Sequence, residues 1–130
     1  MSSLNAWDHS SRKKPGMHQG MHKGSVAEEI ARGAPAARVV EAIPPTTDIP
    51  AAGSHWLPGQ KVGTFYCGDD EAAKAAVAGL LRDLDLEPVD AGPLRSARYI
   101  EPAGMLVVQP AYNRGLGPHV GMKVLRGGAA

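Results

Sequence analysis

The sequence predicts an α/β fold, with about three strands in a partial parallel sheet, flanking helices and a helical region at the C-terminal end. Two short runs rich in β-branched and aromatic residues, 38–43 and 62–67, have the length and composition of buried strands. Apolar side chains then recur at helical spacing from Ala73 to Leu84, and residues 87–90 form a third, short extended segment. Strands separated by a helix of this length are typical of parallel β-α-β units.

The first helix is expected to begin after Ser25. Ser25 and Glu28 have the spacing of a capping box, in which the two side chains satisfy backbone groups of the first turn. Gly33 and Pro35 should stop the helix, because glycine favours a C-terminal cap and proline cannot continue a helix. The apolar face of this helix comprises Val26, Ala27, Ile30 and Ala31.

A pair of aspartates, Asp69 and Asp70, precedes the longest predicted helix. Carboxylates at this position complement the positive end of the helix dipole. Adjacent carboxylates also suit Mg²⁺, so a metal site is the alternative. Capping explains both residues, and no metal ligand is assigned.

The C-terminal helical region is expected to start near Leu94. Pro102 should bend or break it, and Pro110 should prevent a regular helix from continuing, since proline lacks a backbone donor and clashes with the preceding turn. Arg98 and Glu101 are three residues apart, which is the spacing of an ion pair along one helix.

Composition and charge exclude several classes of protein. The chain has 130 residues, enough for one domain; residues 1–24 carry a net charge of +3 and the remainder −2, so the body is a poor match for nucleic acid. No apolar run approaches the roughly 18 residues of a membrane span, and no apolar stretch typical of a secretion signal is present. The single cysteine, Cys67, cannot form an internal disulfide and is expected to be a small core residue, in agreement with a cytoplasmic location.

Residues 1–24 are expected to form a disordered arm that is dispensable for folding. Polar residues and glycines dominate this segment, so little burial could offset the entropy of ordering it. His18 and His22 lie four residues apart, but without a neighbouring carboxylate or cysteine they make an incomplete metal site. Residues 44–60 have the proline, glycine and serine content of a loop.

Three segments, 65–74 (FYCGDDEAAK), 88–94 (PVDAGPL) and 97–102 (ARYIEP), resemble the second half of the NADPH-dependent deazaflavin coenzyme F-420 reductases, within the broader NADP oxidoreductase family. The resemblance runs over about residues 25–126. It implies that residues 25–130 are the C-terminal half of a Rossmann-type domain that transfers hydride between NADPH and coenzyme F-420. Such a transfer needs no protein nucleophile or acid–base pair, so no catalytic residue is assigned.

The same resemblance implies where the two cofactors would bind. Ala42 and Ile43, at the end of their strand, would lie near the nicotinamide of NADP, and Leu116 and Gly117 would lie near the deazaflavin. The end of a strand is also where open parallel sheets place ligands. The alternative is structural: Ala42 and Ile43 are then ordinary strand residues, and Gly115 and Gly117 are turn residues.

The chain departs from the family in one important respect. No Gly-x-Gly-x-x-Gly segment, the turn that binds dinucleotide pyrophosphate, occurs in it. The chain alone is therefore expected to bind NADP weakly or not at all and to be inactive, whether it is a natural truncation, a degenerate copy or a mis-started reading frame. A partner chain could supply the missing half; the alternative is a non-catalytic α/β association module or a degenerate remnant of the family.

Self-association is expected as well. Val39 and Val40 would form an unpaired sheet edge, and such edges recruit other strands. The final helical region adds more apolar surface than one small sheet can cover. A homodimer is therefore expected, as the resemblance also implies, and neither nucleic acid nor a membrane is an expected partner.

Overall fold

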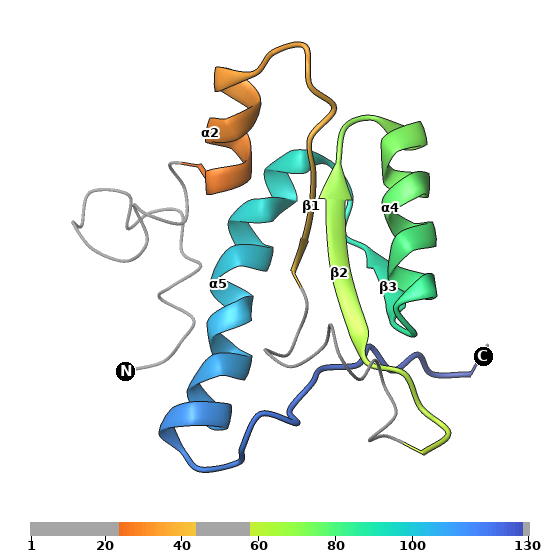
Figure 1. The fold of residues 1–130 in the computed structure, drawn as a ribbon, viewed down its shortest axis with the longest axis vertical. Helices are drawn as coiled ribbons and strands as arrows, with labels where there is room; N and C mark the ends of the chain where they lie inside the picture. Colours follow the sequence, from red (N-terminus) through yellow and green to blue (C-terminus); the bar gives the residue numbers. More distant parts are fainter. Residues whose placement is uncertain (1–23, 44–57, 129–130) are drawn as a thin grey trace.

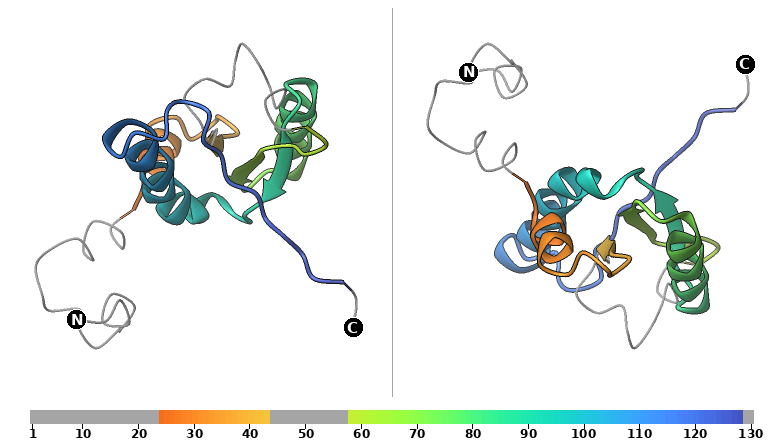
Figure 2. Two further views of the ribbon diagram at one scale, coloured as in Figure 1. Left: turned by 90° about the horizontal axis from the view of Figure 1, so that it is seen from below. Right: turned by 90° about the horizontal axis from the view of Figure 1, so that it is seen from above.

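In the computed structural model, which describes residues 24–43 and 58–128, a three-stranded sheet lies between α4 on one face and α2 and α5 on the other (Figure 1, Figure 2). In chain order the elements are α2 (Val26–Gly33), β1 (Val40–Ile43), β2 (Gly63–Gly68), α4 (Glu71–Asp83), β3 (Glu87–Asp90), the 3-10 helix η3 (Leu94–Ser96), α5 (Ala97–Val108) and the π-helix η4 (Gln109–Asn113). The predicted arm, apart from Gly24, and most of the predicted loop 44–60 lie outside the described residues.

The strand order is β1-β2-β3, and the pairing is mixed. β2 and β3 run parallel, with Gly63 opposite Glu87, and α4 connects them as expected of a β-α-β unit. β1 instead runs antiparallel to β2, with Ile43 opposite Phe65. The predicted α/β class, with three strands and flanking helices, is confirmed, whereas the expectation of a wholly parallel sheet is wrong for β1.

The direction of β1 agrees with the composition of the segment that connects it to β2. A parallel pair needs a crossover connection, usually a helix, whereas an antiparallel pair needs only a loop that joins the two strands at the same end of the sheet. Residues 44–60 are rich in proline and glycine and have no apolar helical period, so the sequence offers no crossover helix here. The register accordingly places the end of β1 beside the start of β2.

The strand boundaries differ slightly from the predicted ones. β1 begins at Val40, so Arg38 and Val39 precede it, and β2 extends to Gly68. Val39 packs against the core cluster on the side of α2 and α5. Val39 thus lies just before β1, which is an edge strand of the described sheet, and recruitment of another strand to this edge stays a prediction.

Two helices start as the sequence predicts. Ser25 Oγ accepts the N–H of Glu28 at 3.1 Å and donates to Glu28 Oε2 at 2.9 Å. This is a variant of the capping box, because the carboxylate contacts the serine hydroxyl. Asp70 Oδ1 accepts the N–H of Ala73 at 2.8 Å and caps α4, which confirms the capping role of Asp70.

The C-terminal helical region starts at Leu94, as predicted. α5 stays helical through Pro102, so the predicted break there is wrong. Pro102 cannot donate a backbone hydrogen bond to the preceding turn, but burial of Ile100 and Val107 stabilises the helix on both sides of it. Pro110 does end the regular α-helix, because η4 begins at Gln109.

The sheet divides the core into two clusters built mostly from aliphatic residues. The cluster on the side of α2 and α5 comprises Ala27, Cys67, Leu94, Ala97 and Ile100. The cluster on the side of α4 comprises Val62, Leu81 and Leu86. Cys67 is fully buried, which confirms its expected place in the core.

Candidate functional site

Ala42 and Ile43 lie at one end of the sheet. β1 ends there at Ile43, close to the points where β2 and β3 begin, at Gly63 and Glu87. The segment after η4, residues 114–128, which we call the tail, crosses the same end and is drawn in blue in Figure 1. The structure therefore brings the end of β1 and the tail to one side of the molecule. Because β1 is antiparallel, this side is the amino-terminal end of the parallel strands β2 and β3, so the expectation that Ala42 and Ile43 lie at the carboxyl ends of parallel strands is wrong.

Ala42 and Ile43 pair with Tyr66 and Phe65 of β2. The side chain of Ala42 is partly buried and packs against the core cluster on the side of α4. For the Ala42 side chain, this packing agrees with the structural interpretation of the sequence. A contact of either residue with a nicotinamide stays a prediction.

Leu116 and Gly117 close the end of η4. The N–H of Leu116 donates to the carbonyl of Pro110 at 3.1 Å, and the N–H of Gly117 donates to the carbonyl of Ala111 at 3.0 Å. Gly117 has a φ of 81°, in the left-handed region that favours glycine. The turn leaves the Leu116 side chain 66% exposed, so a large apolar group is held in solvent by a defined backbone.

Beyond this turn the tail is fixed to the sheet. The N–H of Gly63 donates to the carbonyl of Met122 at 2.8 Å, and a Cβ at Gly63 would lie 3.2 Å from the same oxygen. Lys123 Nζ lies 3.1 Å from Glu87 Oε2. Leu116 and Gly117 therefore lie in a segment that is anchored at both ends, by η4 and by the first residues of β2 and β3.

The described helices α2, α4 and η3 carry carboxylates of the chain itself at their N-termini. Glu101 accepts the first two N–H groups of α2, both at 3.1 Å. Asp70 caps α4, and Asp69 Oδ1 accepts the N–H of Leu94 at 2.9 Å at the start of η3. A dinucleotide pyrophosphate binds free N–H groups at such a helix start. The starts of α2, α4 and η3 therefore fit it poorly, since a carboxylate of the chain already accepts at least one N–H group at each and its charge is negative.

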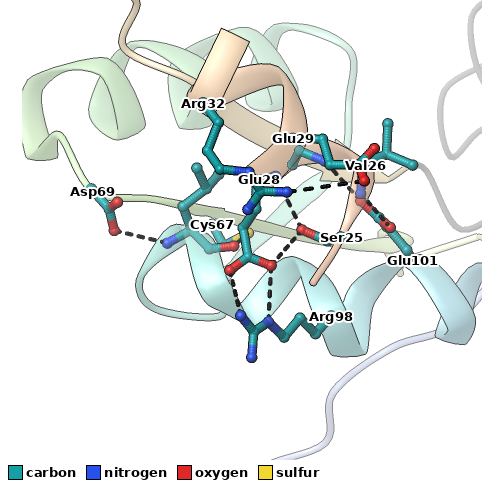
Figure 3. A network of polar contacts seen from close by, with 11 residues as sticks. Ser25, Val26, Glu28, Glu29, Arg32, Cys67, Asp69, Arg98 and Glu101 are labelled. Atoms are coloured by element: carbon teal, nitrogen blue, oxygen red, sulfur yellow. Dashed lines mark hydrogen bonds and ion pairs between the residues drawn. The ribbon is translucent and has the colours of Figure 1, made fainter. Parts of the chain in front are cut away.

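Two side chains of α5 hold the start of α2 (Figure 3). Arg98 Nε lies 2.9 Å from Glu28 Oε2, and Arg98 Nη2 lies 2.9 Å from Glu28 Oε1. Hydrogen bonding with Arg98 lowers the pKa of Glu28 below its usual value. Glu101 covers the N-terminus of α2 from the same helix. The sequence predicts an ion pair between Arg98 and Glu101 along α5. It does not predict the contacts of these two residues with α2, because their partners there lie 70 to 75 residues away in the sequence.

A buried lysine joins α4 to the end of β3. Lys74 has a side chain only 5% exposed, and its Nζ lies 2.9 Å from Asp90 Oδ1 and 3.6 Å from Glu71 Oε1. The hydrogen bond with Asp90 raises the pKa of Lys74 and lowers that of Asp90. The ammonium group is satisfied by these partners and has a structural role.

Neither a reactive thiol nor a metal-binding cluster occurs in the part of the chain that the structure describes. Burial raises the pKa of Cys67 to about 11, so its thiol is protonated and unreactive at neutral pH. Across residues 24–43 and 58–128, no three His, Cys, Asp or Glu side chains come close enough to hold a metal ion. None of the helices in the described part of the chain is long and apolar enough to cross a bilayer.

Comparison with solved structures shows a similarity over most of the chain. No protein-family model matches the chain. A solved structure from Arthrobacter sp. FB24, described as a candidate F-420-dependent NADP reductase, is similar to it, with a TM-score of 0.59 and 27% sequence identity. The match covers 77% of this chain and 46% of that one. The chain thus shares an α/β, reductase-like fold with part of that protein and spans less than half of its length.

Proposed function

We propose that the chain is the F-420-binding half of an oxidoreductase that transfers hydride between NADPH and coenzyme F-420. The observation that carries this proposal is the similarity, over 77% of the chain, to a candidate F-420-dependent NADP reductase. In this function the protein aligns two rings and excludes water, and it supplies no nucleophile and no acid or base.

The tail is the segment best suited to the deazaflavin ring. Leu116 offers an exposed apolar side chain on an anchored turn. Gly117 has no side chain, so a flat ring can approach its backbone closely. Ala42 and Ile43, at the end of β1 on the same edge, would border the nicotinamide. Coenzyme F-420, when bound there, supplies the ring that accepts or donates the hydride.

The phosphates of NADP need a site outside the described residues. The starts of α2, α4 and η3 hold Glu101, Asp70 and Asp69 in the position that a pyrophosphate would occupy. A half with its own phosphate-binding turn, on a partner chain or on a longer form of this chain, would complete the enzyme. Without that half, hydride transfer from NADPH is not expected.

A non-catalytic association module is the second candidate. It is favoured by the apolar side chains that α2 and α5 leave exposed, which are Val26, Ile30, Tyr99, Met105 and Leu106. Apolar surface of this kind usually marks an interface. A second copy of the chain is the occupant we propose, and it would also shield the edge strand β1 from other strands.

Binding of coenzyme F-420 tests the first candidate. The deazaflavin is fluorescent, so its anisotropy can be followed as protein is added to a fixed concentration of the coenzyme. Leu116→Asp should weaken binding by about tenfold or more, because an apolar contact becomes a charge. Leu125→Asp is the matched control, since Leu125 is a tail leucine that is 81% exposed. Absence of binding to the wild type, or an equal loss in both variants, would contradict the proposal.

A further inference from the structure

Glu41 of β1 and Glu101 of α5 form a carboxyl pair at the start of α2. Glu41 lies opposite Cys67 in the pairing of β1 with β2, and Cys67 belongs to the core cluster beneath α2 and α5. The two carboxyl groups share a side-chain hydrogen bond, which requires a proton on one of them. Glu41 Oε2 is buried and has no hydrogen-bond partner among the described residues.

The surroundings of the two groups determine which one carries the proton. Both oxygens of Glu101 accept N–H groups of α2, at 3.1 Å each, and a helix N-terminus favours a negative charge (Figure 3). Glu41 has a buried oxygen without a donor. Burial, and then the charge of Glu101, raises the pKa of Glu41 to about 7. The proton of the pair therefore resides on Glu41.

Glu28, Arg98 and Lys74, which are among the other charged groups around the pair, keep their charge near neutral pH. In the described part of the chain, the groups that surround Glu41, Glu101 and Cys67 are Glu28 on α2, Arg98 on α5, Lys74 on α4 and Asp69 after β2. Arg98 and Lys74 have raised pKa values and stay positive, whereas Arg98 lowers the pKa of Glu28, which stays negative. The pKa of Cys67 is about 11, so its thiol stays neutral.

We propose that Glu41 and Glu101 form a proton-operated latch that holds α2 on α5. While Glu41 carries the proton, it donates to Glu101, and Glu101 caps α2. When Glu41 loses the proton, two carboxylates face each other at the start of α2, and the hydrogen bond between them is lost. Ala27 is the buried residue of α2, whereas Val26 and Ile30 are exposed, so the polar contacts at its start carry much of its docking.

The direction of the pH dependence follows from the proton count. Undocking of α2 lets water reach both carboxylates, so that Glu41 titrates near its ordinary value of 4.5 in the undocked state. The docked state therefore binds more protons between about pH 4.5 and 7, and docking weakens as the pH rises through this range. Between pH 6 and pH 8 the docking equilibrium should fall by about tenfold.

Hydrogen exchange of the α2 amides, corrected for the intrinsic rate at each pH, measures this equilibrium. In the wild type, protection should fall about tenfold from pH 6 to pH 8. In Glu41→Gln it should stay constant, because the glutamine amide donates to Glu101 at every pH. Glu29→Gln is the matched control: Glu29 is an exposed glutamate of α2, and this variant should behave as the wild type. An equal fall in Glu41→Gln and the wild type would overturn the proposal.

A second measurement uses the wild type alone and decides the matter if Glu41→Gln fails to fold. The side-chain carboxyl carbon of Glu41 can be followed by NMR as the pH changes. A titration midpoint near pH 7, accompanied by shifts of the first amides of α2, supports the latch. A midpoint near pH 4.5, or a titration that the α2 amides do not sense, overturns it.

Discussion

Glu28 on α2 and Arg98 on α5 form a bidentate ion pair in which two guanidinium nitrogens each lie 2.9 Å from a carboxylate oxygen. α2 precedes the sheet in the sequence and α5 follows it, so this pair ties together two distant parts of the chain. It also fixes the relative position of the two helices that cover one face of the sheet (Figure 2).

Replacing Arg98 with alanine should therefore release α2 before the rest of the protein unfolds. Loss of the paired hydrogen bonds should lower hydrogen-exchange protection in α2 on the order of tenfold. Arg98→Lys keeps the charge without the planar fork and should recover only part of the protection. Arg95→Ala, which changes an exposed arginine of η3, is the control. Unchanged protection in Arg98→Ala would show that the pair does not hold α2.

The Lys74–Asp90 pair should respond unequally to removal of its two members. Asp90→Asn leaves a lysine that is 5% exposed without its nearest counter-charge, whereas Lys74→Met leaves an aspartate that is 47% exposed and can be hydrated. We expect Asp90→Asn to cost about 1–2 kcal/mol of unfolding free energy, below the value for a fully buried pair. Lys74→Met should cost less. Urea denaturation at pH 7 measures both, and the reverse order would contradict the proposed role of Lys74.

The same pair predicts a loss of stability in acid. The hydrogen bond with Lys74 lowers the pKa of Asp90 below its usual 3.8. The folded protein then binds fewer protons than the unfolded chain, so the contribution is present above about pH 3.8 and is lost as the pH falls further. Denaturation curves of the wild type and Asp90→Asn should converge below pH 3.8. If the two proteins instead lose stability in parallel as the pH falls, the lowered pKa of Asp90 does not contribute to stability.

The buried hydroxyl oxygen of Thr64 is expected to lower the free energy of unfolding. It is fully buried in β2, and its Oγ1 has no hydrogen-bond partner among the described residues. Thr64→Val replaces this hydroxyl with a methyl group and should raise the unfolding free energy by about 1 kcal/mol, or the melting temperature by about 4 °C. Thr64→Ser keeps the hydroxyl, removes the methyl group and should destabilise. A destabilised Thr64→Val would indicate a partner for the hydroxyl.

If the homodimer forms through α5, a charge placed on the exposed face of α5 should disrupt it. Leu106 is 70% exposed on α5, and Leu80 is 62% exposed on α4, which covers the opposite face of the sheet. Leu106→Lys should shift the protein from dimer to monomer, whereas Leu80→Lys should not. Val39 is less suitable for this test, because its partly buried side chain packs against the core. A monomeric wild type in sedimentation at micromolar concentration would contradict the dimer.

The features predictable from the sequence are the local ones. Ser25 and Glu28, three residues apart, were enough to locate the start of α2, and Asp70 marked the start of α4. These caps depend on neighbouring residues, so spacing alone identifies them. The limits of β3 agreed with the structure for the same reason, since a helix and a turn bound this segment closely.

The features missed by the sequence involve residues that are distant along the chain. Glu101 reaches α2 across 75 residues, and Asp69 reaches Leu94 across 25, and no spacing rule connects such pairs. The direction of β1 depends on where the chain returns and not on the strand's own residues. The assignment of Ala42, Ile43, Leu116 and Gly117 to cofactors was implied by family resemblance and stays a prediction.

Calorimetric titration of the chain with coenzyme F-420 and, separately, with NADPH tests the central claim most directly. The described residues offer an anchored apolar turn at Leu116 for a deazaflavin, and their helix starts carry carboxylates where a dinucleotide phosphate would bind. We therefore expect saturable heat with coenzyme F-420 and no saturable heat with NADPH. Absence of saturable heat with coenzyme F-420, or binding of NADPH with a low-micromolar dissociation constant, would contradict the claim.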